Sequence, residues 1–239
     1  MTLELKPVFI ETHAVKDFQT LLRNLERGAG EGRLAAVYGR AGRGKTRTVR
    51  WRHAHDGQSI YLRMHTAWSG SPGAFLSSLA YELGLAPCFK VVDRIRSIVG
   101  SLAETPRTVF IDEIEKMPHS FIEIVRDLSD ESGAPFVFIG EEALLGALNR
   151  DRRSWSRTQE VLHFQPLELV DVITYAKLAG SVTLPADAAN VIHKSSGGDF
   201  RLIKRDLRTM FDLANSKRTD KLDAALARQA VEANLRGRA

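Results

Sequence analysis

Five short apolar runs are spread through the first two thirds of the chain. Runs of six to eight residues that are apolar on both sides are typical of strands in a parallel sheet, because helices cover both of its faces. Between these runs, apolar residues recur at every third or fourth position, which predicts amphipathic helices. This alternation indicates an α/β fold. The predicted strands are RLAAVYG at 33–39, SIYLRM at 59–64, RTVFIDE at 107–113, APFVFIG at 134–140 and EVLHFQPL at 160–167.

The helical pattern continues alone after the last strand. Beyond Leu167 no strand run follows, and helical spacing returns in four segments. We therefore predict two domains: an α/β core over residues 1–166, with a parallel sheet flanked by helices, and a small all-helical lid over residues 167–239. The predicted helices cover 12–28, 73–85, 91–103, 120–132 and 141–150 in the core, then 168–180, 185–197, 199–216 and 221–235.

The formal charge is unevenly distributed along the chain. The 239 residues carry a formal net charge of +5. Residues 1–190 hold 23 basic and 23 acidic side chains, whereas residues 191–239 hold 11 basic and 6 acidic ones. The surplus therefore lies in the last fifth of the chain, which favours either a polyanionic partner or a solvated helical face.

Several classes of protein are disfavoured by the composition. No apolar run approaches the ~18 to 20 residues of a membrane span, and the first residues lack the pattern of a signal peptide. Cys88 is the single cysteine, so an internal disulfide framework is excluded. The histidines show no metal-ligand spacing, so no zinc site is expected. We expect a cytoplasmic protein with no membrane role.

The segment GRAGRGKT matches the phosphate-binding pattern G-x-x-x-x-G-K-[ST]. It follows a predicted strand and opens a helix, as this loop requires. Backbone N–H groups of such a loop surround the phosphates, the lysine reaches the β and γ phosphates, and the hydroxyl coordinates magnesium. Since no guanine-reading N-K-x-D and no kinase-type catalytic loop is present, ATP is the expected nucleotide. The loop residues are Gly39, Arg40, Ala41, Gly42, Arg43, Gly44, Lys45 and Thr46.

A second element for magnesium is expected on a neighbouring strand. The run TVFIDE supplies four apolar residues and then Asp112 and Glu113. Asp112 is predicted to bind the metal or its water shell together with Thr46, and Glu113 to polarise an attacking water. The predicted cofactors are therefore ATP and Mg²⁺.

These motifs resemble those of the AAA+ ATPases, and the resemblance covers most of the chain. The segment SSGGDFRLIKRDL (195–207) is similar to the glycine-then-arginine motif of their helical lid, which implies that Arg201 lies over the γ phosphate. The resemblance also implies ATP hydrolysis and an arginine finger shortly before the last strand. Because a finger acts on the nucleotide of a neighbouring subunit, it implies a homo-oligomer, either a ring or a helical filament. Arg157 has the best register and Arg153 the next; Arg150 and Arg152 are further candidates.

One position departs from that family. The strand PFVFIG ends in Gly140, Glu141 and Glu142, where many AAA+ proteins place Asn, Thr or Ser as a polar sensor. If Glu141 takes that position, we expect slow hydrolysis, which suits a switch better than a motor.

Within AAA+, the sequence most resembles the family of the phage Mu B transposition protein and related transposon ATPases. The shared features are the leading ETHAVKDF helix, the segment DEIEKMPHSFIEIVRDLSDESGAPFVFIG and a short helical lid. This resemblance implies an ATPase in the bacterial host cytoplasm that oligomerises on duplex DNA without sequence preference. It further implies delivery of target DNA to a DDE transposase, stimulation of that enzyme, and target immunity.

The residues that contact DNA are less clearly indicated. Lysines and arginines that bind only phosphates give binding without sequence preference. Arg47, Arg50 and Arg52, in the helix after the phosphate loop, favour subunit contacts or ion pairs over DNA contacts. The candidates for DNA contact are Arg63, Lys90, Arg94, Arg96, Lys116, Lys204 and Arg205.

Other functions remain open from the sequence. The same superfamily includes helicase loaders and replication initiators, and secretion-type ATPases. A nucleotide-gated protein scaffold with little turnover would fit the unusual Gly140–Glu141 pair. A small-molecule P-loop kinase would leave the lid motif and the arginine cluster without a role.

Overall fold

The computed structural model describes residues 2–28, 32–68 and 70–236, which form two compact units. The α/β unit comprises Val15–Arg40 and Lys45–Phe164. The helical unit comprises the N-terminal segment as far as Ala14, the loop residues Ala41–Gly44 and the chain from Gln165 onward. The break after the last strand falls two residues before the predicted one, while the first residues and the tip of the phosphate loop join the helical unit.

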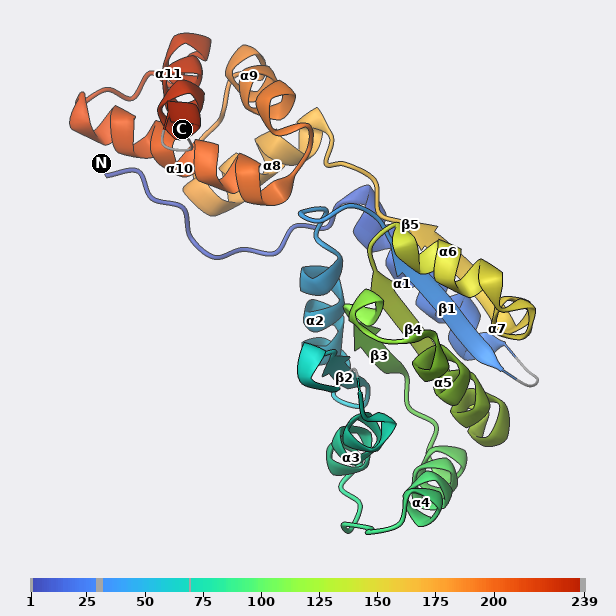
Figure 1. The fold of residues 1–239 in the computed structure, drawn as a ribbon. Coiled ribbons are helices and arrows are strands. Elements are labelled where there is room, and N and C mark those ends of the chain that lie inside the picture. The colour runs from blue at the N-terminus through green and yellow to red at the C-terminus, as the bar shows by residue number, and fades with distance from the viewer. Residues whose placement is uncertain (1, 29–31, 69, 237–239) are drawn as a thin grey trace. The chain divides into compact units, whose positions relative to one another are not determined.

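The sheet of the α/β unit has five parallel strands in the order β2-β3-β4-β1-β5 (Figure 1). This arrangement confirms the predicted α/β fold class. Strands β1 and β3 are not neighbours, because β4 lies between them and pairs with both. The strands are β1 (Arg33–Tyr38), β2 (Ile60–Arg63), β3 (Val109–Asp112), β4 (Pro135–Gly140) and β5 (Thr158–His163).

Helices flank this sheet, as the apolar periodicity predicted (Figure 1). Most helix bounds lie within two residues of the predicted ones. The helices of the α/β unit are α1 (His13–Arg27), α2 (Lys45–Asp56), α3 (Pro72–Glu82), α4 (Val91–Glu104), α5 (His119–Ser132), α6 (Ala143–Arg150) and α7 (Arg152–Arg157), with 3-10 turns η1 (Thr66–Trp68) and η2 (Ile114–Lys116).

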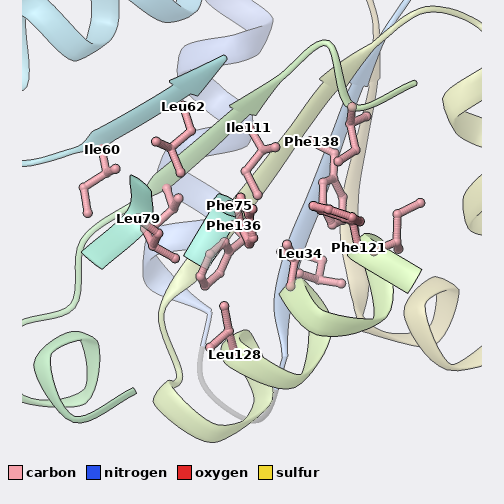
Figure 2. Close-up of a cluster of buried hydrophobic side chains, with 14 of the residues drawn as sticks. Leu34, Ile60, Leu62, Phe75, Leu79, Ile111, Phe121, Leu128, Phe136 and Phe138 are labelled. Carbon is pink, nitrogen blue, oxygen red and sulfur yellow. The ribbon is translucent and has the colours of Figure 1, made fainter. Parts of the chain in front are cut away.

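Both faces of the sheet are buried, which explains the continuous apolar runs. On one face, Leu34, Ile111 and Phe136 point toward side chains from α3 and α5 (Figure 2). There the rings of Phe75 and Phe121 are 5.9 Å apart between centroids. The opposite face packs against α1, where the rings of Phe18 and Phe110 are 6.1 Å apart. Each fully buried aromatic or aliphatic side chain contributes about 1.5–3 kcal/mol to folding.

The helical unit has its own apolar core. It consists of α8 (Leu169–Gly180), α9 (Ala186–Ser196), α10 (Phe200–Ser216) and α11 (Ala224–Arg236). The N-terminal segment adds to this core: the backbone N–H of Lys6 donates to the Ala179 carbonyl at 2.8 Å. In the described part of the chain, no helix has the length and apolarity that crossing a membrane requires. The core side chains include Tyr175, Ile192, Leu207, Met210 and Phe211.

Candidate nucleotide site

The phosphate loop leaves β1 at Tyr38 and enters α2 at Lys45. The Lys45 side chain is 8% exposed, and its Nζ donates to the carbonyl oxygens of Gly39 and Arg40, the latter at 3.0 Å. A buried ammonium needs such acceptors. The Lys45 ammonium thereby lies beside the start of the loop, and its contact with phosphate oxygens remains a prediction.

The tip of the loop is held by the junction of α9 and α10 in the helical unit. The Phe200 N–H donates to the Gly42 carbonyl at 2.9 Å, and Arg43 Nη1 donates to the Gly197 carbonyl at 2.7 Å. At Gly42, where φ is +81°, a Cβ atom would lie only 1.9 Å from Asp199 Oδ2. Glycine is therefore required here both by the backbone conformation and by the neighbouring carboxylate.

The same junction positions Arg201, the predicted lid arginine. Asp199 caps α10, since its Oδ1 accepts the N–H groups of Arg201 at 2.7 Å and Leu202 at 3.2 Å. The Arg201 side chain is exposed and makes no ion pair with another described residue. Its contact with a nucleotide remains a prediction.

Asp112, the last residue of β3, is 2% exposed. Its Oδ2 accepts the Tyr61 hydroxyl at 2.8 Å, and its Oδ1 accepts the Glu113 N–H at 3.0 Å. No described lysine or arginine forms a salt bridge with this carboxylate. Burial, and then the hydrogen bond to Asp112, raise the pKa of Tyr61, so its hydroxyl stays protonated.

Asp112 and Thr46 together suit Mg²⁺ by their chemistry. Mg²⁺ prefers one or two carboxylate oxygens along with hydroxyl, water and phosphate oxygens. The buried Asp112 carboxylate, which pairs with no described lysine or arginine, and the hydroxyl residue at the start of α2 provide this donor set, so the residues fit the predicted metal.

Glu113, the predicted water-activating residue, follows in the left-handed conformation with φ of 60°. Its carboxylate accepts Arg63 Nε at 3.0 Å and the Lys116 ammonium. Burial raises the pKa of Glu113, but the hydrogen bonds from Lys116 and Arg63 outweigh it and hold this pKa below its ordinary value. Two candidates for DNA contact, Arg63 and Lys116, are thus engaged at the nucleotide site.

The end of β4 carries a polar group that the sequence did not indicate. A Cβ atom at Gly140 would lie 2.6 Å from Glu115 Oε2, so the glutamate carboxylate occupies the space that another side chain would fill. Desolvation raises the pKa of Glu115, partly offset by the backbone N–H groups of Glu115 and Glu141. The position of Glu115 could not be predicted, because the sequence does not show that η2 packs against the end of β4.

The finger candidates lie in and before α7. Arg157 Nε donates to both carboxylate oxygens of Asp130, at 3.0 and 3.2 Å. The side chains of Arg150, Arg152 and Arg153 are exposed, and none forms an ion pair with another described residue. The structure therefore engages Arg157 within its own chain and leaves its neighbours accessible.

Three of the remaining candidates for DNA contact bind other groups of the chain, and two do not bind another described side chain. Arg94 donates to the Gly73 carbonyl at 3.0 Å and to the Cys88 carbonyl, which shapes the connection between α3 and α4. Arg96 lies 3.6 Å from Asp93, and Arg205 lies 2.7 Å from the buried Asp206. Of these candidates, Lys90 and Lys204 have no side-chain partner among the described residues.

Of the three arginines after the phosphate loop, Arg52 makes the ion pairs that were expected. It lies 3.7 Å from Glu26 and 3.4 Å from Asp56.

The model for the AAA domain matches residues 20–148, more than half of the chain. The chain is also 24% identical over 207 residues to the Mu-like prophage FluMu DNA transposition protein B of Haemophilus influenzae, covering 82% of this chain and 70% of the relative. The sequence resemblance and this comparison thus lead to the same group of proteins.

Solved structures with the same fold include the Aeropyrum pernix ORC1 protein in complex with DNA. It has a TM-score of 0.65 and 19% identity, covering 95% of this chain and 66% of that one. The Thermotoga maritima RuvB Holliday junction branch migration motor has a TM-score of 0.57 and 20% identity, covering 94% and 70%. At such identities these similarities establish the fold alone. Taken with the matched domain, they confirm that the chain belongs to the AAA family of P-loop ATPases.

Proposed function

We propose that this ATPase binds duplex DNA without sequence preference, assembles on it in an ATP-dependent manner, and delivers target DNA to a DDE transposase. The observation that carries this proposal is the similarity to a Mu-like prophage DNA transposition protein B over 82% of the chain. The nucleotide site, the basic surface and the accessible arginines each supply one requirement of that function.

ATP binding rests on the residues of the phosphate loop. Lys45 binds the β and γ phosphates, Thr46 and Asp112 hold Mg²⁺, and Glu113 orients the attacking water. The metal, when bound, neutralises charge that develops on the phosphates. Because Arg63 and Lys116 both hold the Glu113 carboxylate, the described conformation favours slow turnover.

DNA binding rests on basic side chains that have no partner among the described residues. Lys90 is the residue before α4 and follows Phe89, whose side chain is fully exposed. In the helical unit, Lys204 lies on α10 with Arg201 and Arg208. Such side chains bind phosphates regardless of sequence, and each contact adds to the salt dependence of binding.

Assembly rests on the arginines near α7. Arg150, Arg152 and Arg153 are accessible for a neighbouring subunit, and Arg157 becomes accessible if it leaves Asp130. A homo-oligomer in which one of them reaches a neighbour's ATP would couple hydrolysis to assembly.

The first experiment measures ATP hydrolysis with and without non-specific duplex DNA, with negative-stain images of the same samples. We expect filaments or rings on DNA that require ATP, with altered turnover. The matched control is Lys45→Ala, which should bind ATP more weakly and should not show ATP-dependent assembly. Turnover indifferent to DNA, together with absence of assembly, would instead favour a protein scaffold or remodelling ATPase.

A second experiment tests the surface. Lys90→Ala and Lys204→Ala should each weaken binding equally on unrelated DNA sequences and reduce the salt slope by about 1. Lys177 is an exposed lysine on α8, and Lys177→Ala is the control, which should leave the affinity and the salt slope unchanged.

The transposase step is tested by strand transfer into DNA pre-bound by this protein. Loading of a helicase instead of stimulation of strand transfer would support the alternative of a helicase loader.

A further inference from the structure

Strand β2 places two polar side chains beside the two acids that follow from β3. Ile60 and Leu62 belong to the apolar core, so Tyr61 and Arg63 share the opposite face of the strand. Strands β2 and β3 pair in parallel, with Arg63 opposite Asp112. The register therefore brings both β2 side chains to the end of β3.

The two acids receive donors of different charge. Glu113 is held by Arg63 and Lys116, which are cationic. Asp112 is held by the Tyr61 hydroxyl and a backbone N–H, which are neutral. A cationic partner would compete with a metal for the carboxylate, whereas a neutral donor fixes its orientation and leaves its charge in place.

The lone pairs of Asp112 remain available under this arrangement. An ionised carboxylate has about four acceptor sites, and the hydrogen bonds from described residues use one on each oxygen of Asp112. With both oxygens anchored, the plane of the carboxylate is fixed and one further site per oxygen is left for a metal or its water.

We propose that Tyr61 is a positioning residue for the divalent cation: its hydroxyl orients Asp112 for Mg²⁺ without neutralising it. This inference rests on the metal site of the proposed function and adds to it a residue outside both nucleotide-binding motifs. Packing alone does not require the hydroxyl, since phenylalanine would fill the same space on the strand.

The test compares nucleotide binding with and without metal in the full-length Tyr61→Phe variant. A fluorescent ATP analogue is titrated in EDTA, and Mg²⁺ is then titrated at fixed nucleotide. We expect the affinity in EDTA to change less than about twofold, because Lys45 and the loop are untouched. The Mg²⁺ concentration for half-maximal effect should rise about tenfold, as expected for loss of a hydrogen bond to a charged group. Bound Mn²⁺, followed by electron paramagnetic resonance, gives a readout independent of turnover.

The control is Tyr38→Phe, which removes a phenol hydroxyl from another strand of the sheet. Its hydroxyl makes no hydrogen bond to a described residue, and its ring stacks on His163 at 4.7 Å between centroids. This variant should keep the wild-type Mg²⁺ dependence. An equal shift in both variants would overturn the proposal, since it would reflect a general effect on the sheet.

A double-mutant cycle separates this inference from the proposed metal site. If Tyr61 acts through Asp112, then Tyr61→Phe adds no further shift in an Asp112→Asn background. Two results would contradict the metal site itself: nucleotide binding by the wild-type protein that does not depend on Mg²⁺, or a wild-type Mg²⁺ dependence in Asp112→Asn. An intact Mg²⁺ dependence in Tyr61→Phe, with its loss in Asp112→Asn, would overturn the role of Tyr61 alone.

Discussion

Arg157 and Asp130 form an ion pair within one chain, with Arg157 Nε 3.0 Å from Asp130 Oδ1. The pair joins the end of α7 to α5, and both side chains are partly exposed. Arg157 is also the arginine that the sequence placed in the best register for a finger. A finger must reach a neighbouring subunit, so this arginine would have to exchange Asp130 for the neighbour's nucleotide.

Two substitutions distinguish a finger from a structural pair. Arg157→Ala should spare ATP binding by the monomer and lower turnover of assemblies at least tenfold, because a finger contributes strongly to phosphoryl transfer. Asp130→Asn keeps the guanidinium but weakens its partner, so assembly turnover should be maintained. Equal losses of turnover and thermal stability in both variants would assign Arg157 a structural role, and Arg153→Ala would then be the next variant to assay.

Lys45→Ala should strongly weaken nucleotide binding. The Lys45 ammonium is expected to bind the phosphates, and alanine leaves the Gly39 and Arg40 carbonyls without their donor. We expect the dissociation constant for ATP to rise at least about tenfold, the effect of losing a charged hydrogen bond. Isothermal titration calorimetry measures this directly. Assembly on DNA that persists in Lys45→Ala would mean that ATP does not control assembly.

Glu113→Gln should separate binding from hydrolysis. The amide retains the size of the side chain but cannot act as a base, so turnover should fall by about 10²-fold or more. ATP binding should be unchanged, and the DNA-bound state should persist. The measurement is phosphate release beside a DNA dissociation time course. Rapid phosphate release by this variant would exclude Glu113 from the assigned role.

The raised pKa of Glu115 gives a prediction for stability against pH. Because the folded state disfavours its carboxylate, the contribution of Glu115 to stability is present below its ordinary pKa of 4.5 and lost as the pH rises through the raised value. Glu115→Gln removes this charge and should raise the melting temperature at pH 7 relative to wild type. The difference should vanish near pH 4.

Thermal unfolding at both pH values provides the measurement for Glu115→Gln. Glu104→Gln, at the exposed end of α4, serves as the control. A lower melting temperature of Glu115→Gln at pH 7 would mean that its carboxylate stabilises the end of β4.

Much of the fold could be predicted because its signals are local. Strands β1, β3 and β4 are buried on both faces and appear as continuous apolar runs. Helix α7 was missed, since its sequence RRSWSR has no apolar periodicity. It forms because the Asp151 side chain accepts the Arg153 N–H at 3.0 Å and caps it. Strand β5 alternates in burial and was placed too late in the chain.

The sequence also predicted those site residues that lie in contiguous motifs, but not the partners that the fold brings to them. The phosphate loop, Asp112 and Glu113 are contiguous motifs. The partners Tyr61 and Arg63 lie about 50 residues earlier and become neighbours only through the pairing of β2 with β3. Isolated basic residues such as Arg63 look alike in a sequence, whether they bind a carboxylate within the chain or a phosphate outside it.

Strand β2 is four residues long and lies at an edge of the sheet, hydrogen-bonded to β3 alone. Segments with few neighbours open at lower free energy than the rest of a domain, so the amides of β2 should exchange with solvent deuterium sooner than those of β1 or β4. Each such opening would release Tyr61 from Asp112 and Arg63 from Glu113 at once. Local unfolding of this one strand would then determine the fraction of molecules in which Asp112 and Glu113 are correctly oriented. This fraction would already decrease at temperatures well below the global melting temperature.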